Sequence, residues 1–168
     1  MDILSLFITV PVLTILALVL SNGLKQARII SVIGSLIQFG MAINLVFAYF
    51  AERAINSDIM VFTKDVVWYK QFNIHYSIGV DGISVALLLL TSIVVLAGVF
   101  ISWKMKDLPK EFFVSLIVLS IGVYGFFISL DLFTMFVFFE IAVIPMYLLI
   151  GIWGSGPKEY SAMKLTLM

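Results

Sequence analysis

The sequence contains no cysteine. Disulfide bonds, thiolate metal sites, iron–sulfur clusters and thiol nucleophiles all require cysteine, so they are excluded for this chain. The single histidine, His75, cannot supply the paired axial ligands of a membrane b-type haem, and no glycine-rich phosphate-binding loop occurs. We therefore expect no cofactor in this chain, and we expect any linked redox chemistry to take place on other subunits.

Charged residues are also scarce. They make up 12% of the chain and hydrophobic residues make up 62%, whereas soluble domains have about 25% and about 50%. The formal net charge is zero, so nothing in the composition indicates a nucleic-acid partner. The composition predicts an all-α integral membrane protein that lies in the lipid bilayer.

Long apolar runs predict five transmembrane helices and the start of a sixth, within a single membrane domain over residues 1–168. The helices are expected over residues 3–20, 29–50, 83–103, 112–130 and 132–153, with the sixth starting at residue 160. The second helix carries Gln38 among several small residues. We interpret Gln38 as a packing contact between helices, with a place on a hydrated path as the alternative.

The polar connection over residues 51–82 is expected to lie outside the membrane. From Phe72 to Val80 apolar and polar residues alternate, which is typical of a half-exposed strand, and the segment 66–69 is a candidate for pairing with it as a hairpin. His75 lies on the polar face of this strand, where it is either solvated or a proton carrier. Asp81 and Asp131 each precede an apolar run, so we interpret both as helix N-caps, with a site on an ion path as the alternative for Asp131.

Glu140 lies in the middle of the fifth apolar run. From Leu132 to Trp153 a helix would be about 33 Å long, with Glu140 about 12 Å from its start and therefore inside a hydrocarbon core of about 30 Å. A carboxylate at that depth costs a few kcal/mol at least, so we expect it to face protein or a hydrated cavity. Glu140 is therefore a candidate proton-transfer group, and a purely structural ion pair between helices is the alternative.

Pro145 follows five residues after this acid. A proline has no N–H, so it cannot bond the carbonyl of Ile141 four residues earlier, and it usually kinks the helix. Inside a membrane the freed carbonyl needs a partner such as water or a polar side chain. We therefore expect a local water pocket beside Glu140.

The distribution of lysine and arginine predicts the orientation. Short turns after the first, third and fifth helices carry six of these residues: Lys25, Arg28, Lys104, Lys106, Lys110 and Lys158. The opposite side has three, in one long connection: Arg53, Lys64 and Lys70. The positive-inside rule therefore places the amino terminus and the long connection outside, and the lysine-rich turns in the cytoplasm.

Two stretches resemble a known family. Residues 76–91 contain Gly-Val-Asp-Gly-Ile-Ser, and residues 131–154 contain Glu-x-x-x-x-Pro-Met-Tyr. Both are similar to the antiporter-like subunits of proton-pumping NADH:quinone oxidoreductase (respiratory complex I), and the second pattern points to the subunit M, or subunit 4, type.

This resemblance implies the N-terminal part of an inverted-repeat bundle that moves protons as a non-redox subunit of the translocating enzyme. It implies that Glu140 is the proton-transfer glutamate of the fifth helix, which works with lysines of later helices. Lys164 matches a family lysine near the start of the sixth helix, although Lys158 and Glu159 stand where an arginine is often found. The implied partners are the bilayer, the neighbouring membrane-arm subunits and a second polypeptide that supplies further helices.

Two other functions share parts of this pattern. A subunit of a multi-component sodium/proton antiporter or of a membrane-bound hydrogenase would use the same scaffold. A non-conducting fragment that fills a place in the membrane arm would use the helices without the proton chemistry. The ion, H⁺ or Na⁺, and the quinone stay open at this stage.

Overall fold

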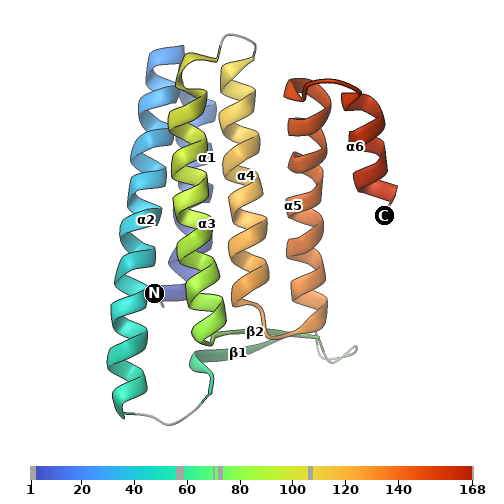
Figure 1. Cartoon of the computed structure of the whole chain (residues 1–168). Coiled ribbons are helices and arrows are strands. Elements are labelled where there is room, and N and C mark those ends of the chain that lie inside the picture. Colours follow the sequence, from blue (N-terminus) through green and yellow to red (C-terminus); the bar gives the residue numbers. More distant parts are fainter. Residues whose placement is uncertain (1–2, 56–58, 70, 72–73, 106–107, 168) are drawn as a thin grey trace.

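The computed structural model describes residues 3–55, 59–69, 71, 74–105 and 108–167, and its helices and strands follow the order expected for a multi-pass membrane protein (Figure 1). Among these residues five helices are long and apolar enough to cross a membrane. In chain order the elements are α1 (Ile3–Leu20), α2 (Leu24–Ile55), β1 (Val61–Tyr69), β2 (Ile74–Val80), α3 (Gly82–Ile101), the 3-10 turn η2 (Ser102–Lys104), α4 (Pro109–Ile128), α5 (Leu132–Trp153) and α6 (Lys158–Leu167).

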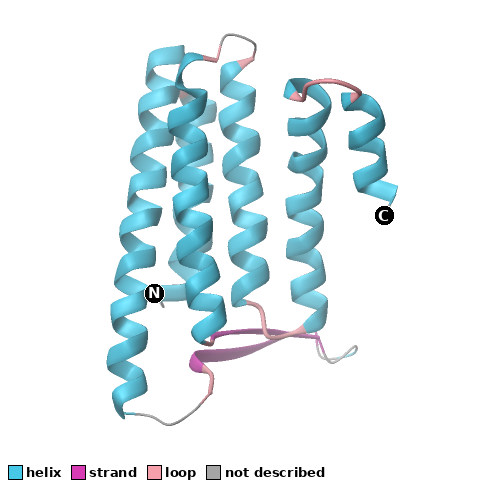
Figure 2. Ribbon diagram, viewed as in Figure 1, coloured by secondary structure: helices cyan, strands magenta, loops and turns pink. Residues whose placement is uncertain are grey.

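Helices α1 to α4 form a bundle, α5 lies beside α4, and α6 lies beside α5 (Figure 1). The two strands lie across one end of the helices, at the starts of α3 and α5 (Figure 2). The turns between α3 and α4 and between α5 and α6 lie at the other end (Figure 1). The polar connection and the lysine-rich turns are therefore at opposite ends of the helices.

Helix α2 is longer than the sequence predicts. It runs from Leu24 to Ile55, 32 residues, rather than over residues 29–50, and is about 48 Å long. Hydropathy detects only the part that lies in hydrocarbon. The helix continues through good helix formers at both ends, including Lys25 and Glu52, into the polar regions beyond the membrane.

Helix α4 ends at Ile128, two residues earlier than predicted. The residues that follow it pair with strand β2. Ser129 forms an antiparallel bridge with Ile78, and the Leu130 N–H donates to the Ser77 carbonyl at 2.8 Å. The Ser129 N–H still bonds the Gly125 carbonyl, and the helical pattern stops after it because the Leu130 N–H bonds the strand instead.

Strands β1 and β2 form the antiparallel hairpin that the sequence predicts, with Val66 opposite Tyr76. Ile78 and Val80 are buried as the alternation requires, whereas Phe72, at the start of the predicted strand, lies outside the described residues. Gly79 is buried as well, since Leu130 covers the other face of the strand there. Residue 79 departs from the alternation because the α4–α5 junction packs on the strand.

Gln38 is buried in the bundle, and its amide is a packing contact as the sequence predicts. Its Nε2 donates to the Phe7 carbonyl of α1 at 3.0 Å. That carbonyl would otherwise accept from residue 11, but Pro11 has no N–H to donate. A side chain of α2 therefore satisfies the carbonyl that the proline frees in α1, which keeps a backbone group from being unsatisfied within the membrane.

We expect Gln38→Leu to destabilise the chain by about 1–3 kcal/mol, because it leaves the buried Phe7 carbonyl without a donor. In a Pro11→Ala background residue 11 has an N–H again, so the same Gln38→Leu change should cost much less. Unfolding in mixed micelles of the four combinations measures this coupling. An equal loss of stability in both backgrounds would contradict the assignment of the Gln38 amide to the freed carbonyl.

Candidate functional site

Helix α5 begins at a polar junction. Asp131 is its N-cap, as the sequence predicts, and the carboxylate accepts from the Thr134 N–H at 3.1 Å. Asp81 caps α3 in the same way, accepting from the Ser84 N–H at 2.7 Å. This bond lowers the pKa of Asp81 below its usual range, with desolvation acting in the opposite direction. Both aspartates therefore have the capping role that their places in the sequence indicate.

Helix α5 packs on α4 through glycines. A side chain at Gly122 would overlap the Ala142 backbone nitrogen, and one at Gly125 would overlap the ring of Phe138. Pro145 lies near the same face and is buried. These contacts fix which face of α5 is turned toward the bundle.

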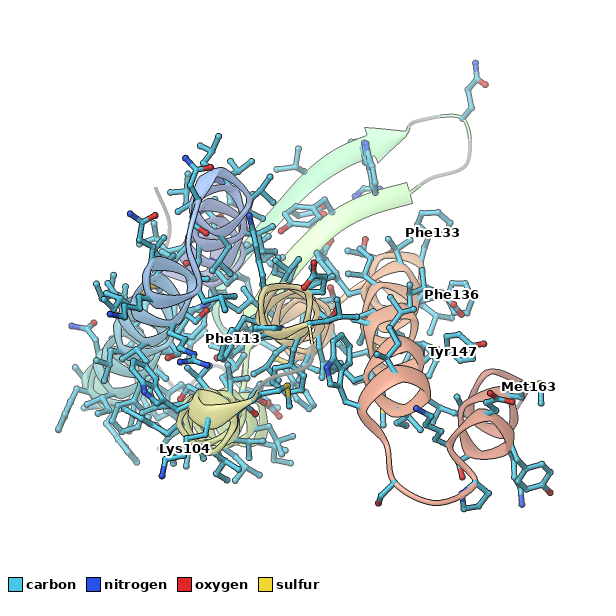
Figure 3. All side chains as sticks on the ribbon, turned by 90° about the horizontal axis from the view of Figure 1, so that it is seen from above. Lys104, Phe113, Phe133, Phe136, Tyr147 and Met163 are labelled. Carbon is cyan, nitrogen blue, oxygen red and sulfur yellow. The ribbon has the colours of Figure 1, made fainter. Side chains whose placement is uncertain are left out.

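Glu140 lies on the opposite face of α5. Successive helical residues are about 100° apart, so Glu140 is about 200° around the helix from Phe138. It is exposed, as are the aromatic residues Phe133, Phe136 and Tyr147, which point away from the bundle in Figure 3. We call this surface the outward face of α5.

The expectation that protein or a hydrated cavity would enclose Glu140 is therefore not met by the described part of this chain. The reason is that α5 has few neighbours within the chain. Only 6% of its membrane-spanning residues are buried, against 28% to 44% in the other four spans. Any surface that covers Glu140 comes from outside these helices, whether lipid or protein.

Lys164 lies on α6, which begins to cover the outward face from the far end. A side chain at Gly151 of α5 would meet Ala162 of α6 at 3.7 Å. Lys164 is exposed and lines a groove with Ile150, about 15 Å along α5 from Glu140. The structure thus brings Lys164 to α5 without bringing it to Glu140.

The water pocket expected beside Glu140 stays a prediction, and the cavity that the structure shows next to Ile141 is apolar. Helix α5 continues from Leu132 to Trp153 with Pro145 inside it. Ile141 lines a cavity of about 430 Å³ that lies between α5 and the hairpin, and Glu140 is not among its lining residues. The lining residues are mostly apolar: Val66, Val67, Trp68, Tyr76, Thr134, Val137, Phe138 and Ile141. This lining does not favour a chain of water molecules.

His75 pairs with a carboxylate instead of being fully solvated. Its Nδ1 lies 2.9 Å from an Asp65 carboxylate oxygen, and the Ser77 hydroxyl donates to the same carboxylate. These bonds hold the pKa of Asp65 below its usual range, with the Ser77 bond as the larger cause. Within the described residues no cluster of three histidine, aspartate or glutamate side chains is placed to hold a metal ion.

Sequence reasoning missed Thr134 and Asp65. The Thr134 hydroxyl has two acceptors within reach, the backbone carbonyl of His75 at 3.2 Å and an Asp131 carboxylate oxygen at 3.4 Å, and the contact with His75 is the shorter. Thr134 and His75 are 59 positions apart, so no local pattern indicates this contact. The spacing of Thr134 three residues after the Asp131 cap is a signal for the cap only.

Comparisons with known proteins agree with this arrangement. Residues 129–168 match a family model described as NADH:quinone oxidoreductase/Mrp antiporter, TM. NAD(P)H-quinone oxidoreductase chain 4 1 of a Nostoc species is 29% identical over 98% of this chain and 30% of its own length. NADH-quinone oxidoreductase subunit M of Rhodobacter capsulatus is 37% identical over 64% of this chain and 21% of its own.

This chain matches the N-terminal part of an antiporter-like subunit of the subunit M type. The match covers less than a third of the length of each of these curated relatives. Respiratory complex I from Thermus thermophilus shares the fold, with a TM-score of 0.77 at 20% identity over 98% of this chain and 32% of its own. An archaeal membrane-bound sulfane sulfur reductase does so too, with a TM-score of 0.77 at 19% identity over 99% of this chain and 34% of its own. The resemblance in sequence and the expected membrane fold are thereby confirmed.

The bonds of Asp65 with His75 and Ser77 predict how the stability of the hairpin depends on pH. Because the pKa of Asp65 is lowered in the folded hairpin, its contribution to stability is present above the ordinary value of 3.8 and is lost as the pH falls through the lowered value. The protection factors of the β1 and β2 amides in detergent, corrected for the pH dependence of the intrinsic exchange rate, should therefore stay constant down to about pH 4 and fall below it. Asp65→Asn should weaken this pH dependence, and an unchanged acid profile in that variant would assign the effect to other groups.

Proposed function

We propose that this chain is part of a proton-translocating, antiporter-like subunit of an NADH:quinone oxidoreductase. The observation that carries the proposal is an acid in the middle of a membrane span, Glu140, on a face that the described helices leave uncovered. Intramembrane acids that are not paired within their own bundle are functional groups by default. The names of the relatives in sequence indicate the enzyme complex.

In this proposal the Glu140 carboxyl group moves the proton. It accepts a proton from a half-channel on one side of the membrane and exchanges it with a lysine on a later helix of the subunit. An acid and a base that are close enough to exchange a proton titrate as a coupled pair, so a change at one changes the proton affinity of the other. The chain itself contributes no redox group, and quinone reduction on neighbouring subunits supplies the free energy.

Lys164 has a lesser role in the proposal. It lies at the end of α5 away from the hairpin, in the groove beside Ile150, too far from Glu140 for a direct ion pair. A cation there can stabilise negative charge on a proton path that enters along α6. We therefore assign it to the entrance of the path and not to the exchange step.

The proposed partners follow from the uncovered face. A membrane helix with an acid on its outward face needs a protein surface that can bond the carboxyl group. Further helices of the same subunit, supplied by a second polypeptide or by more of the same chain, would cover α5, and neighbouring membrane-arm subunits would complete the assembly. The lipid bilayer surrounds the rest.

A multi-component sodium/proton antiporter is the second candidate. The family model names both groups of proteins, and the likeness to the archaeal reductase shows that several complexes share this scaffold. The fold alone does not separate them. The oxidoreductase is favoured because the curated relatives quoted above, one of which matches nearly the whole chain, are oxidoreductase subunits.

The carrier role of Glu140 is tested by Glu140→Gln in the assembled complex. Glutamine keeps the size and hydrogen bonding but cannot ionise. We expect proton uptake into inverted vesicles, normalised to assembled complex and to NADH oxidation, to fall by about tenfold or more, as for loss of an acid–base group. Glu159→Gln, on the exposed first turn of α6, is the control.

Near-normal pumping with glutamine at position 140 would refute the carrier role. It would support the non-conducting alternative, in which the helices fill a place in the membrane arm without conducting protons. Loss of assembled complex, measured separately by native gels, would identify a structural ion pair instead. The two measurements together therefore distinguish a proton carrier from a packing charge.

We also propose that the chain lies in a bacterial plasma membrane with its amino terminus and hairpin outside. The described cations at the end of the helices away from the hairpin are Lys25, Arg28, Lys104, Lys110 and Lys158, while Lys106 lies outside the described residues. Three of them bond carbonyls there. The Arg28 Nη2 donates to the Met105 carbonyl at 3.1 Å. The Lys110 Nζ donates to the Val19 and Ser21 carbonyls at 3.0 and 2.9 Å, and the Lys158 Nζ donates to the Ile152 carbonyl at 3.0 Å.

Single cysteines test this topology, because the native chain has none. Ile59→Cys, next to the hairpin and 74% exposed, should react with a membrane-impermeant maleimide from outside intact cells. Ser155→Cys, in the exposed turn after α5, should react only after the membrane is opened. Labelling of both positions from the same side, or labelling in the reverse order, would overturn the orientation.

A further inference from the structure

Strand β2 holds the start of α5 through its backbone carbonyls. The Ser77 carbonyl accepts from the Leu130 N–H at 2.8 Å, and the His75 carbonyl accepts from the Thr134 hydroxyl at 3.2 Å. Ser129 and Ile78 form the bridge next to them. The α4–α5 junction therefore adds to the hairpin like a third strand, and the Thr134 side chain extends this pairing into the first turn of α5.

His75 and Ser77 of β2 are also bonded to strand β1, through their side chains. The side chains of His75 and Ser77 both bond the Asp65 carboxylate of β1. Alternate residues of a strand share an orientation, so one carboxylate can fix both. We call Asp65, His75, Ser77 and Thr134 the hairpin clasp.

We propose that the hairpin clasp sets the axial position of α5 and thereby the depth of Glu140 in the membrane, with Thr134 as the positioning residue. This inference rests on the proposed function of Glu140. Thr134 is six residues before Glu140, about 9 Å along the helix. A shift of about 1 Å at a reacting group can cost about a hundredfold in rate.

Two observations make Thr134 the critical member. It is 2% exposed, so water cannot replace the bond between its hydroxyl and the His75 carbonyl. Helix α5 is also the least buried span, since 6% of its membrane-spanning residues are buried, and most of its contacts are with α4. The glycine contacts with α4 set the face of α5 and its distance from α4, whereas the clasp supplies bonds that resist sliding along the helix axis.

The experiment compares Thr134→Val with Thr134→Ser in the full-length protein within the assembled complex. Valine keeps the shape of threonine without the hydroxyl, and serine keeps the hydroxyl. We expect proton uptake per NADH to fall severalfold with valine and to be close to normal with serine. Thr91→Val is the matched control, because the Thr91 hydroxyl bonds the Leu87 carbonyl of its own helix at 2.7 Å.

A second readout measures position without proton transport. In a Glu140→Cys background, the rate of alkylation at residue 140 should change severalfold with Thr134→Val and be restored with Thr134→Ser. The clasp is overturned if valine and serine give the same alkylation rate. A changed alkylation rate together with normal pumping in Glu140→Gln would keep the clasp as a positioning device and refute the proton role of Glu140.

Discussion

In hydrocarbon a backbone carbonyl has no water to bond, and this constraint decides much of the structure. It explains why the freed Phe7 carbonyl is bonded by Gln38, a residue from another helix. At the end of α1 the helix itself offers no donors to its last carbonyls, and Lys110 bonds the carbonyls of Val19 and Ser21 there. Where the chain leaves α4, the hairpin provides the acceptor for the Leu130 N–H. Polar side chains in this protein mainly complete backbone hydrogen bonding that the helices leave unfinished.

Features that depend on neighbouring residues were predictable from the sequence. The five spans follow from apolar runs, and the caps at Asp81 and Asp131 follow from an acid placed directly before such a run. The length of α2 was underestimated because hydropathy responds to hydrocarbon, not to helix formation. The hairpin was predicted from alternation. Its pairing with the α4–α5 junction was not, because β2 and Leu130 are brought together only by the folded bundle.

In the candidate site, too, local features were predictable from the sequence and contacts between distant residues were not. The position of Glu140 along its span can be counted from the sequence, so its depth was predictable. The direction in which it points depends on which face of α5 fits the glycines of α4, and that is a property of two helices in contact. Lys164 was matched to the family from its sequence position, yet α6 places it near Ile150. A shared motif therefore identifies residue types more readily than distances between them.

The outward face of α5 has a consequence for how such a protein is made. After insertion, and before any partner covers it, Glu140 faces lipid, where an ionised carboxylate costs a few kcal/mol at least. A surface that bonds this carboxyl group recovers that free energy on docking, so assembly is favoured by the same residue that we assign to proton transfer. Unassembled copies would also be less stable in the membrane, which gives membrane proteases a basis for removing them. The acid would thus link biogenesis to the proton transfer that we propose for it.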